Sequence, residues 1–325
     1  MPDMADQVAE ELPPSFSHTA LIVESIEKAA DRFREVFGVS FGSAEEYAFS
    51  RTDASGRTTH STLRMSVSLT REPYFVLVEA VDEQDRVFDR EQLGSLAYWG
   101  WWEEDPEDRL RKLRQEGVGI AATYATAPGC SPEMIITEPD LYGTRICYVA
   151  PALKNRMTAQ AGLAEEGSLP DSYYHVGMVV PDIDEAIQRC ATVFGVSFTA
   201  AAWTESPHQQ EGDVTHIPFR QRQAISRTRE PYVELIEATG DGVFGPSRAG
   251  TLLYYACWER DMKARLARLR SQGFGMDAVI RMDAASDPIA AITSYDHHGI
   301  RLELADPAVK PVMEQWARAG QLPGS

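Results

Sequence analysis

The chain has 325 residues, of which 43% are hydrophobic and 25% are charged, and its formal net charge is −18. This length suggests roughly two domains, each able to bury a core, and so acidic a surface argues against nucleic-acid and membrane partners because it repels phosphate groups. No apolar run is long enough to span a bilayer, no secretory signal is visible, and the four cysteines lack metal-type spacing, so we expect a cytoplasmic protein with free thiols.

The predicted elements alternate between strands and helices. Residues 1–14 are expected to form a flexible acidic arm, and 18–25 is rich in β-branched residues, as in a strand. Apolar residues recur at helical spacing over 26–38, and this helix ends at Gly38. Further strands follow, ending in 73–81. The order then restarts with a strand at 95–102, a helix at 107–117 and strands near 119–125, 132–137 and 144–149.

The second half of the chain repeats the first at an offset of about 156 residues. The segments that recur are FGVSF at 37–41 and 194–198, TREPY at 70–74 and 228–232, THSTLR at 59–64 as THIPFR at 215–220, and PALKNRM at 151–157 as PAVKPVM at 307–313. This period is far longer than a solenoid unit, so it indicates a duplicated domain. Each half reads as βαβββ twice.

The repeat sets the expected domain boundaries. We predict one domain at 15–155, a linker at 156–171, a second domain at 172–310, and a C-terminal helix and tail at 311–325.

Three segments of the second half carry a family resemblance: HVGMVVPDIDEAI at 175–187, VELIEA at 233–238 and GIRLELADP at 299–307. They resemble the vicinal oxygen chelate superfamily, which includes glyoxalase I, methylmalonyl-CoA epimerase, extradiol dioxygenases and the bleomycin and fosfomycin resistance proteins. The resemblance covers nearly all of residues 16–310. It implies an α+β fold with a tandem duplication of a glyoxalase-like domain, in which four βαβββ modules form two half-open, cup-shaped mixed sheets.

In this family, metal ligands project into the cup from the first and last strands of each unit. Carried onto the second half, the resemblance places these ligands at His175, Glu234 and Glu303, with Tyr254 where the family has a histidine. In the first half His18 is retained, but the other three positions hold Val76, Tyr98 and Cys147. We therefore expect the second cup to be active and the first to be degenerate.

Strand periodicity supports the second cup independently. Side chains alternate along a strand, so Leu302 and Leu304 face one side while Arg301 and Glu303 face the other. Glu234 likewise shares a face with the apolar residues of its strand. A glutamate there is costly unless it is paired, protonated or bound to a metal.

Each of these residues also has a structural interpretation. His175 is compatible with a core histidine, the glutamates with ion pairs to an arginine such as Arg301, and Tyr254 with an aromatic lining of the cup. Arg301, His216 and Trp258 are candidate substrate contacts, although His216 is also compatible with packing.

Two carboxylates and a histidine suit a divalent metal ion, and we expect Zn, Mn, Fe, Ni or Mg. The predicted function is a metal-dependent lyase, isomerase or epimerase that acts on a small oxygenated substrate, an aromatic one included, through a stabilised enolate or oxyanion. Glu303, Glu234 or Tyr254 would move the proton. The alternatives are a non-catalytic protein that sequesters an aromatic compound, an extradiol dioxygenase, and a metal-free enzyme using His175 and Glu303. The sequence leaves a homodimer open.

Overall fold

The computed structural model describes residues 16–81, 85–90, 93, 96–139, 144–162, 173–211, 214–239, 243–249, 252–282, 286–295 and 300–323, with backbone alone for 206–219, 248 and 252–253. The predicted N-terminal arm at 1–14 lies outside these ranges, as does most of the predicted linker.

The first half folds into one curled mixed sheet of eight strands. These strands are β1 (His18–Val23), β2 (Glu45–Asp53), β3 (Thr58–Val67), β4 (Tyr74–Glu79), β5 (Leu96–Trp102), β6 (Ile120–Ala125), β7 (Met134–Thr137) and β8 (Ile146–Val149). Their order is β1-β4-β3-β2-β6-β7-β8-β5, and β5 pairs antiparallel with β1, so the sheet closes on itself.

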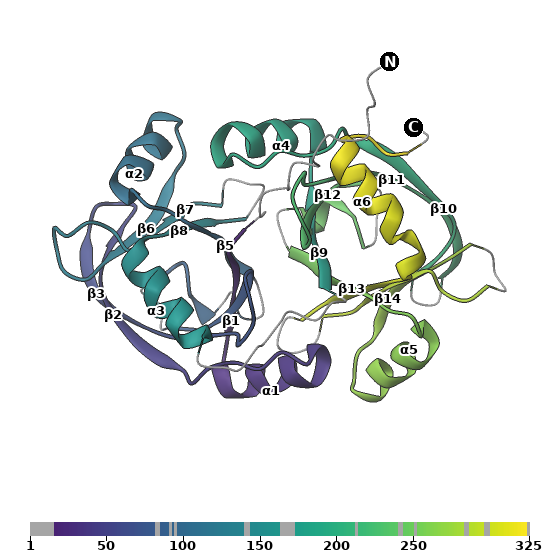
Figure 1. Cartoon of the computed structure of the whole chain (residues 1–325), viewed down its shortest axis with the longest axis horizontal. Coiled ribbons are helices and arrows are strands. Elements are labelled where there is room, and N and C mark those ends of the chain that lie inside the picture. Colours follow the sequence, from purple (N-terminus) through teal and green to yellow (C-terminus); the bar gives the residue numbers. More distant parts are fainter. Residues whose placement is uncertain are drawn as a thin grey trace, which may run out of the picture.

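The second half repeats this arrangement beside the first (Figure 1). Its strands are β9 (Tyr173–Val180), β10 (Ala202–Glu211), β11 (Val214–Ile225), β12 (Tyr232–Glu237), β13 (Leu252–Trp258), β14 (Met276–Arg281), β15 (Ala290–Thr293) and β16 (Leu302–Ala305). Their order is β10-β11-β12-β9-β13-β16-β15-β14, and β14 closes the sheet against β10. We call the interiors of the two sheets the first cup and the second cup.

Helices cover the outsides and the ends of the sheets. They are α1 (Ile26–Phe37), α2 (Pro106–Gln115), α3 (Pro151–Ala161), α4 (Ile183–Arg189, continued by a π-helical turn at Cys190–Phe194), α5 (Met262–Ser271) and α6 (Lys310–Ala319). Helix α1 begins at the capping side chain of Ser25 and ends at Gly38, whose φ of 73° is left-handed. Helix α3 lies across the end of the first sheet and α6 across the end of the second (Figure 1).

The predicted α+β duplication is confirmed, with four βαβββ modules in two curled mixed sheets. The sheets differ from the expected half-open form because their end strands also pair. Residues 156–161, predicted as linker, continue helix α3. Within the described chain, no helix is long and apolar enough to cross a membrane.

The strand register corrects one part of the sequence alignment. Arg64 forms ion pairs with Glu27 and Glu79, and the residue that forms the matching pairs in the second half is Arg222, with Asp184 and Glu237. The motif match THSTLR to THIPFR instead aligns Arg64 with Arg220. This motif match is two residues out of register, because Arg222 already has the offset of 158 residues that relates the two TREPY segments, so the extra residues of the second half precede Arg222.

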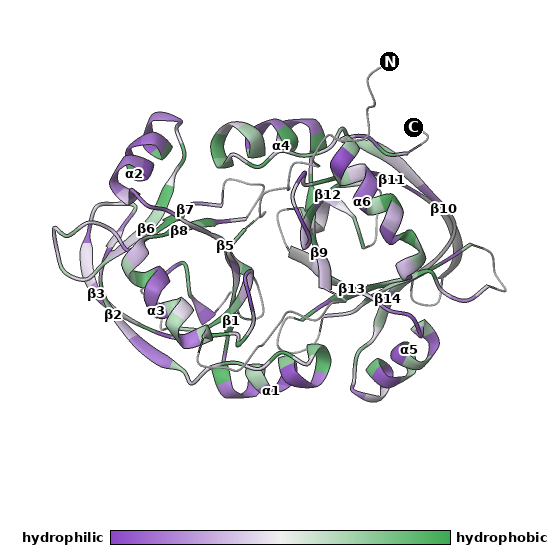
Figure 2. Ribbon diagram, viewed as in Figure 1, coloured by the Kyte–Doolittle hydropathy of each residue, from purple (hydrophilic) through white to green (hydrophobic). Residues whose placement is uncertain are grey.

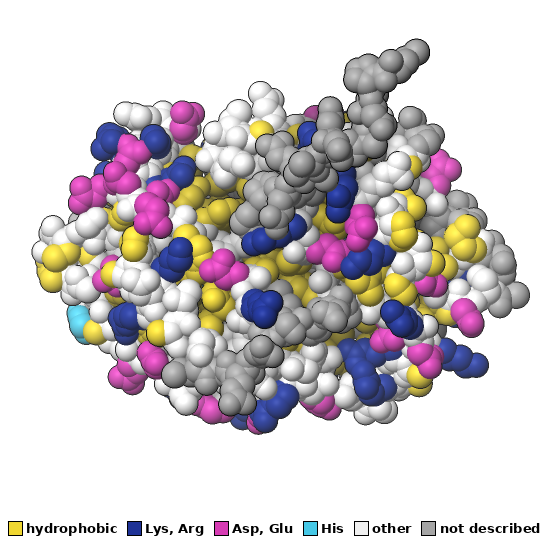
Figure 3. All heavy atoms as spheres, viewed as in Figure 1, with side chains coloured by type: hydrophobic (Ala, Val, Ile, Leu, Met, Phe, Trp, Pro, Cys, Tyr) yellow, Lys and Arg dark blue, Asp and Glu magenta, His cyan; other side chains and the backbone are white. Residues whose placement is uncertain are grey.

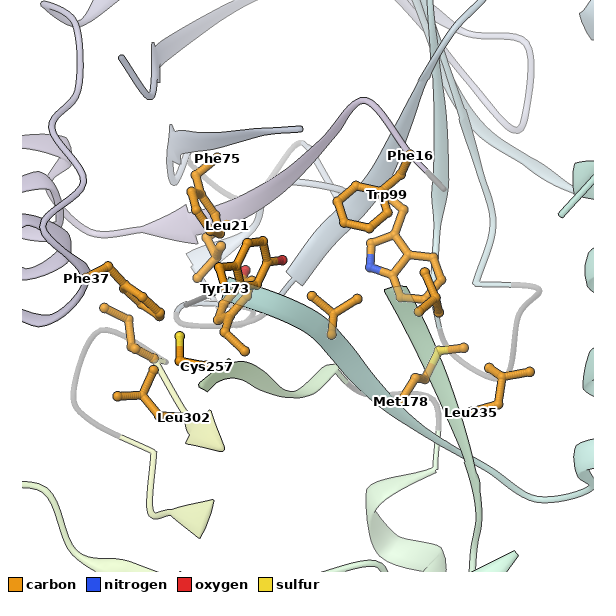
Figure 4. Packing of buried hydrophobic residues seen from close by; sticks show 14 of the residues in the cluster. Phe16, Leu21, Phe37, Phe75, Trp99, Tyr173, Met178, Leu235, Cys257 and Leu302 are labelled. Carbon is orange, nitrogen blue, oxygen red and sulfur yellow. The ribbon is translucent and has the colours of Figure 1, made fainter. Parts of the chain in front are cut away.

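The two halves share an apolar core. Phe33 of α1 packs near Phe75 and near Tyr255 of the second half, with ring centroids 5.3 and 6.5 Å apart, and Phe75 lies 5.4 Å from Tyr173 (Figure 4). The outer sides of α2 and α5 carry many hydrophilic residues (Figure 2). On the face shown in Figure 3, apolar side chains gather between the halves and charges of both signs surround them.

Candidate metal centre

Four side chains converge in the second cup from four neighbouring strands. His175 on β9 is paired with Ala256 of β13, which is paired in turn with Glu303 of β16. On the other side, Glu234 of β12 and Tyr254 of β13 both lie opposite Gly177 of β9. The alternation of side chains along each strand then directs all four into the cup, as the sequence pattern predicts.

The histidine and the two carboxylates are close together and buried. His175 Nε2 lies 3.0 Å from Glu234 Oε2 and 3.0 Å from Glu303 Oε2. The side chains of His175 and Glu234 are 2% and 6% exposed and that of Glu303 is 13% exposed, so water screens these charges poorly. Among the described residues, these three are the group of histidine, cysteine and acidic side chains whose possible metal-ligand atoms all lie within 4.8 Å of one another.

These residues fit a divalent metal ion. His175 Nε2 is near both carboxylates, but neither carboxylate oxygen is aligned to form a hydrogen bond with it. The lone-pair direction of Nε2, in the plane of the ring, can therefore point at a metal ion. Two carboxylates held together in a buried place repel each other, and a cation removes that repulsion. One imidazole and two carboxylates match the preferences of Zn²⁺, Mn²⁺ and similar ions. Nδ1 also lacks a hydrogen-bond partner among the described groups, so the ring has no polar support behind it.

Tyr254 supports Glu234 rather than standing alone. Its hydroxyl donates to Glu234 Oε2 at 2.7 Å. The phenol ring lies directly over Gly177, where a Cβ atom would collide with it. The absence of a side chain at Gly177 therefore lets Tyr254 reach the carboxylate.

The charges of the site shift its protonation equilibria. Burial by itself lowers the pKa of His175, but the negative charge of Glu234, followed by that of Glu303, outweighs it and raises the pKa from 6.5 to about 9. Burial raises the pKa of Glu303, against the opposing effect of His175. The pKa of Tyr254 is raised well above 10 by burial and then by the charge of Glu234. In the metal-free protein the site therefore holds a protonated imidazole and a neutral phenol at pH 7.

Sequence reasoning missed Tyr174. A β-bulge in β9 shifts the register between Ala256 and Cys257, so Tyr174 and His175 face the same side of the strand. The Tyr174 hydroxyl approaches Glu303 Oε2 at 3.4 Å, and its ring stacks on Trp258 with centroids 3.5 Å apart. Simple alternation directs Tyr174 out of the cup, and the adjacent tyrosines at 173 and 174 gave no signal for the bulge.

The first cup has the same register but a different interior. His18, Gly100 and Cys147 form the row that corresponds to His175, Ala256 and Glu303. His18 lies over Gly100 and stacks on Trp102 at 5.2 Å. Burial lowers its pKa to about 3, so this imidazole is neutral.

Of the other residues predicted for the first cup, Val76 and Cys147 do not offer a second group that could bind a metal ion. Val76 is fully buried and apolar, and burial raises the pKa of the Cys147 thiol, which keeps it protonated. Within the described residues, no group of three candidate ligands forms in the first cup.

The predicted substrate contacts lie in different places. Trp258 is in the second cup, 8% exposed, and its indole Nε1 has no hydrogen-bond partner among the described residues. Arg301 precedes β16, pairs with Asp277 and donates to the Thr293 carbonyl at 2.8 Å. Arg301 is thus not the partner of either site glutamate. His216 lies in β11, but its side chain is outside the described residues.

The comparisons with known proteins bear on the fold. The family model described as Glyoxalase/Bleomycin resistance protein/Dioxygenase superfamily matches residues 174–291. A triple mutant of 4-hydroxymandelate synthase from Streptomyces coelicolor is similar over 91% of this chain and 93% of its own, with 14% identity and a TM-score of 0.53. No curated protein matches the sequence.

Two further structures are similar at lower scores. A variant of methylmalonyl-CoA epimerase from Streptomyces coelicolor covers 42% of this chain and 96% of its own, with 17% identity and a TM-score of 0.29. The structure of 2,2',3-trihydroxybiphenyl 1,2-dioxygenase from Sphingomonas wittichii covers 91% of this chain and 90% of its own, with 11% identity and a TM-score of 0.44. The family match lies on the half that contains the His–Glu–Glu group, and the whole-chain likeness to the synthase covers both sheets. Residues 174–291 of this chain therefore match the glyoxalase, bleomycin resistance and dioxygenase superfamily, and the whole chain has the fold of the synthase.

Proposed function

We propose that the second cup is the active site of a metal-dependent lyase, isomerase or epimerase that acts on a small oxygenated molecule. The observation that carries this proposal is the buried group of His175, Glu234 and Glu303, whose ligand atoms lie within 4.8 Å of one another. A divalent ion bound there supplies a Lewis acid that stabilises negative charge on a substrate oxygen.

The protein groups around the site suit proton transfer. A carboxylate whose pKa is raised by burial, as in Glu303, accepts and returns a proton more readily near neutral pH. Tyr254, neutral and hydrogen-bonded to Glu234, fixes that carboxylate in position. The buried cup excludes water, which strengthens each of these interactions.

An extradiol dioxygenase is less well supported by this donor set. Non-haem iron oxygenases use two histidines and one carboxylate, whereas the second histidine position here holds Tyr254, which donates a hydrogen bond to Glu234. The four cysteines are free thiols, which supports our proposal that the protein works in the cytoplasm.

The proposal is tested by comparing Glu303→Gln with Cys147→Ser. These residues occupy matching positions in the two cups, one beside His175 and the other beside His18. Glu303→Gln keeps the shape of the side chain and removes its charge, so binding of Mn²⁺ or Zn²⁺, measured by calorimetry, should weaken at least about tenfold. Cys147→Ser should bind metal as the wild type does.

The outcomes separate the candidate functions. A wild-type protein that binds neither ion refutes the metal-dependent function. If Cys147→Ser alone loses the metal, the active cup has been assigned to the wrong half. Metal binding that depends on Glu303, followed by chelator-sensitive proton exchange on a bound ligand, supports the proposed enzyme class.

A further inference from the structure

The two cups also differ on the wall formed by the first hairpin of each half. In the first cup, Tyr47 of β2 pairs with Leu63 of β3, and both are fully buried. In the second cup, the matching pair is Thr204 of β10 and Gln221 of β11. The next matching position holds Met65 in the first cup and Gln223 in the second, opposite Val78 and Ile236 respectively.

The polar residues of the second wall form a chain of hydrogen bonds with a definite direction. The Thr204 hydroxyl donates to Gln223 Oε1 at 2.7 Å, and Gln223 Nε2 donates to Gln221 Oε1 at 3.2 Å. The acceptor atom of Gln221 is therefore occupied. Its Nε2 remains as a donor, and it is buried with no hydrogen-bond partner among the described residues.

The unpaired Nε2 donor of Gln221 destabilises the folded protein unless a ligand accepts its hydrogen bond. Gln221 is 0% exposed, and leaving a buried amide donor unpaired costs about 1–3 kcal/mol. The first half shows that the same fold accepts leucine at the matching position, Leu63, and fills the space with apolar side chains. The polar wall in the second cup is thus not required to fold the sheet.

We propose that Gln221 is a specificity-determining residue that donates a hydrogen bond to an acceptor oxygen of the substrate. The substrate class is then a small molecule that chelates the metal through adjacent oxygens at one end and carries a carboxylate or carbonyl oxygen at the other. This inference rests on the proposed function, because His175, Glu234 and Glu303 define the chelating end of the site.

The strand register gives the size of this molecule. Glu234 pairs with Ile225, which follows Gln221 by four residues on β11. Four residues of strand span roughly 13 Å between Cα atoms. The two side chains take up part of that distance, so the bridging ligand is about as long as a substituted benzene ring.

The test uses metal-chelating probes that differ only at the far end. With Mn²⁺-loaded protein, the affinities of 3,4-dihydroxybenzoate and 3,4-dihydroxyphenylacetate are compared with that of 4-methylcatechol, which has no distal acceptor. We expect at least one of the two acids to bind the wild type more than about tenfold better than 4-methylcatechol, as one hydrogen bond to a charged group allows. Gln221→Leu, which introduces the first-half residue, should abolish that preference and leave the affinities for Mn²⁺ and 4-methylcatechol unchanged.

Two further variants complete the experiment. Gln221→Glu keeps the length of the side chain but replaces the donor with a carboxylate, so it should bind both acids less well than 4-methylcatechol. Gln160→Leu removes another buried glutamine, whose Nε2 donates to the Ser43 carbonyl in the first half, and should leave the probe preference unchanged.

The results distinguish this inference from the proposed function. A wild type that binds no Mn²⁺ overturns both. A wild type that binds Mn²⁺ but does not prefer either acid, or a preference that survives in both Gln221 variants, overturns the role of Gln221 and leaves the metal site intact.

Discussion

At the scale of single residues, the two matching histidines are held in opposite charge states. In the described part of the chain no carboxylate forms an ion pair with His18, and burial lowers its pKa to about 3. The unfolded chain takes up a proton there near pH 6.5, so His18 contributes stability above that pH that is lost as the pH falls from 6.5 towards 3. Relative to His18→Gln, the chelator-treated wild type should lose up to about 1.4 kcal/mol of unfolding free energy per pH unit in this window, measured by urea denaturation.

His175 should show the opposite dependence in the same metal-free protein. Its pKa is raised to about 9 by the carboxylates, so its contribution is complete below about pH 6.5 and is lost as the pH rises from 6.5 to 9. The difference in unfolding free energy between the wild type and His175→Gln should shrink over that range. A pH-independent difference would contradict the charge state described for this imidazole.

Two glycines offer a matched pair of substitutions. A Cβ at Gly177 collides with the Tyr254 ring, and a Cβ at Gly100 collides with the His18 ring. Both alanine variants should lose about 1–3 kcal/mol of stability by overpacking. Gly177→Ala should in addition weaken Mn²⁺ binding because it displaces the tyrosine that holds Glu234, whereas Gly100→Ala should bind Mn²⁺ normally. Equal metal affinities in the two variants would show that Tyr254 does not position the carboxylate.

At the scale of elements, the bulge in β9 determines which tyrosine reaches the site. Tyr174 faces Glu303 and Trp258 inside the cup, while its neighbour Tyr173 faces the core shared by the two halves. Tyr174→Phe keeps the stacked ring and removes the hydroxyl near Glu303. We expect its Mn²⁺ affinity to fall a few-fold, since the loss of one weak hydrogen bond costs about 0.5–1.5 kcal/mol.

Tyr173→Phe is the control for this prediction. Its hydroxyl is buried and has no hydrogen-bond partner within the described part of the chain, so removing it should leave metal binding unchanged. If both variants bind Mn²⁺ as the wild type does, the bulge is only a structural feature of β9.

At the scale of the whole molecule, the shared core joins the two halves into one folding unit. Phe33 of the first half is fully buried near Tyr255 of the second, and Arg265 donates to the Val36 carbonyl at 2.7 Å. Phe33→Ala should therefore lower the unfolding free energy by about 3–5 kcal/mol and weaken both sheets together. Circular dichroism and tryptophan fluorescence should report one coincident urea transition for the wild type.

The control is Val312→Ala in α6, because this side chain is 43% exposed and its removal should change stability by less than about 0.5 kcal/mol. Two separated transitions in the wild type would show that the sheets fold independently despite the shared aromatic cluster.

The sequence by itself determined the duplication, the order of the elements and the four residues of the candidate site. The duplication and the order of the elements follow from local information, such as the helical stripe that ends at Gly38. The family resemblance placed the four site residues, and side-chain alternation directs Glu303 away from Leu302 and Leu304. Only the tertiary structure decided which further residues line the second cup. Tyr174 enters it through a bulge, and Gln221 enters it through a register two residues away from the motif match. Bulges and register depend on the partner strand, and side-chain alternation within a single strand does not encode that partner.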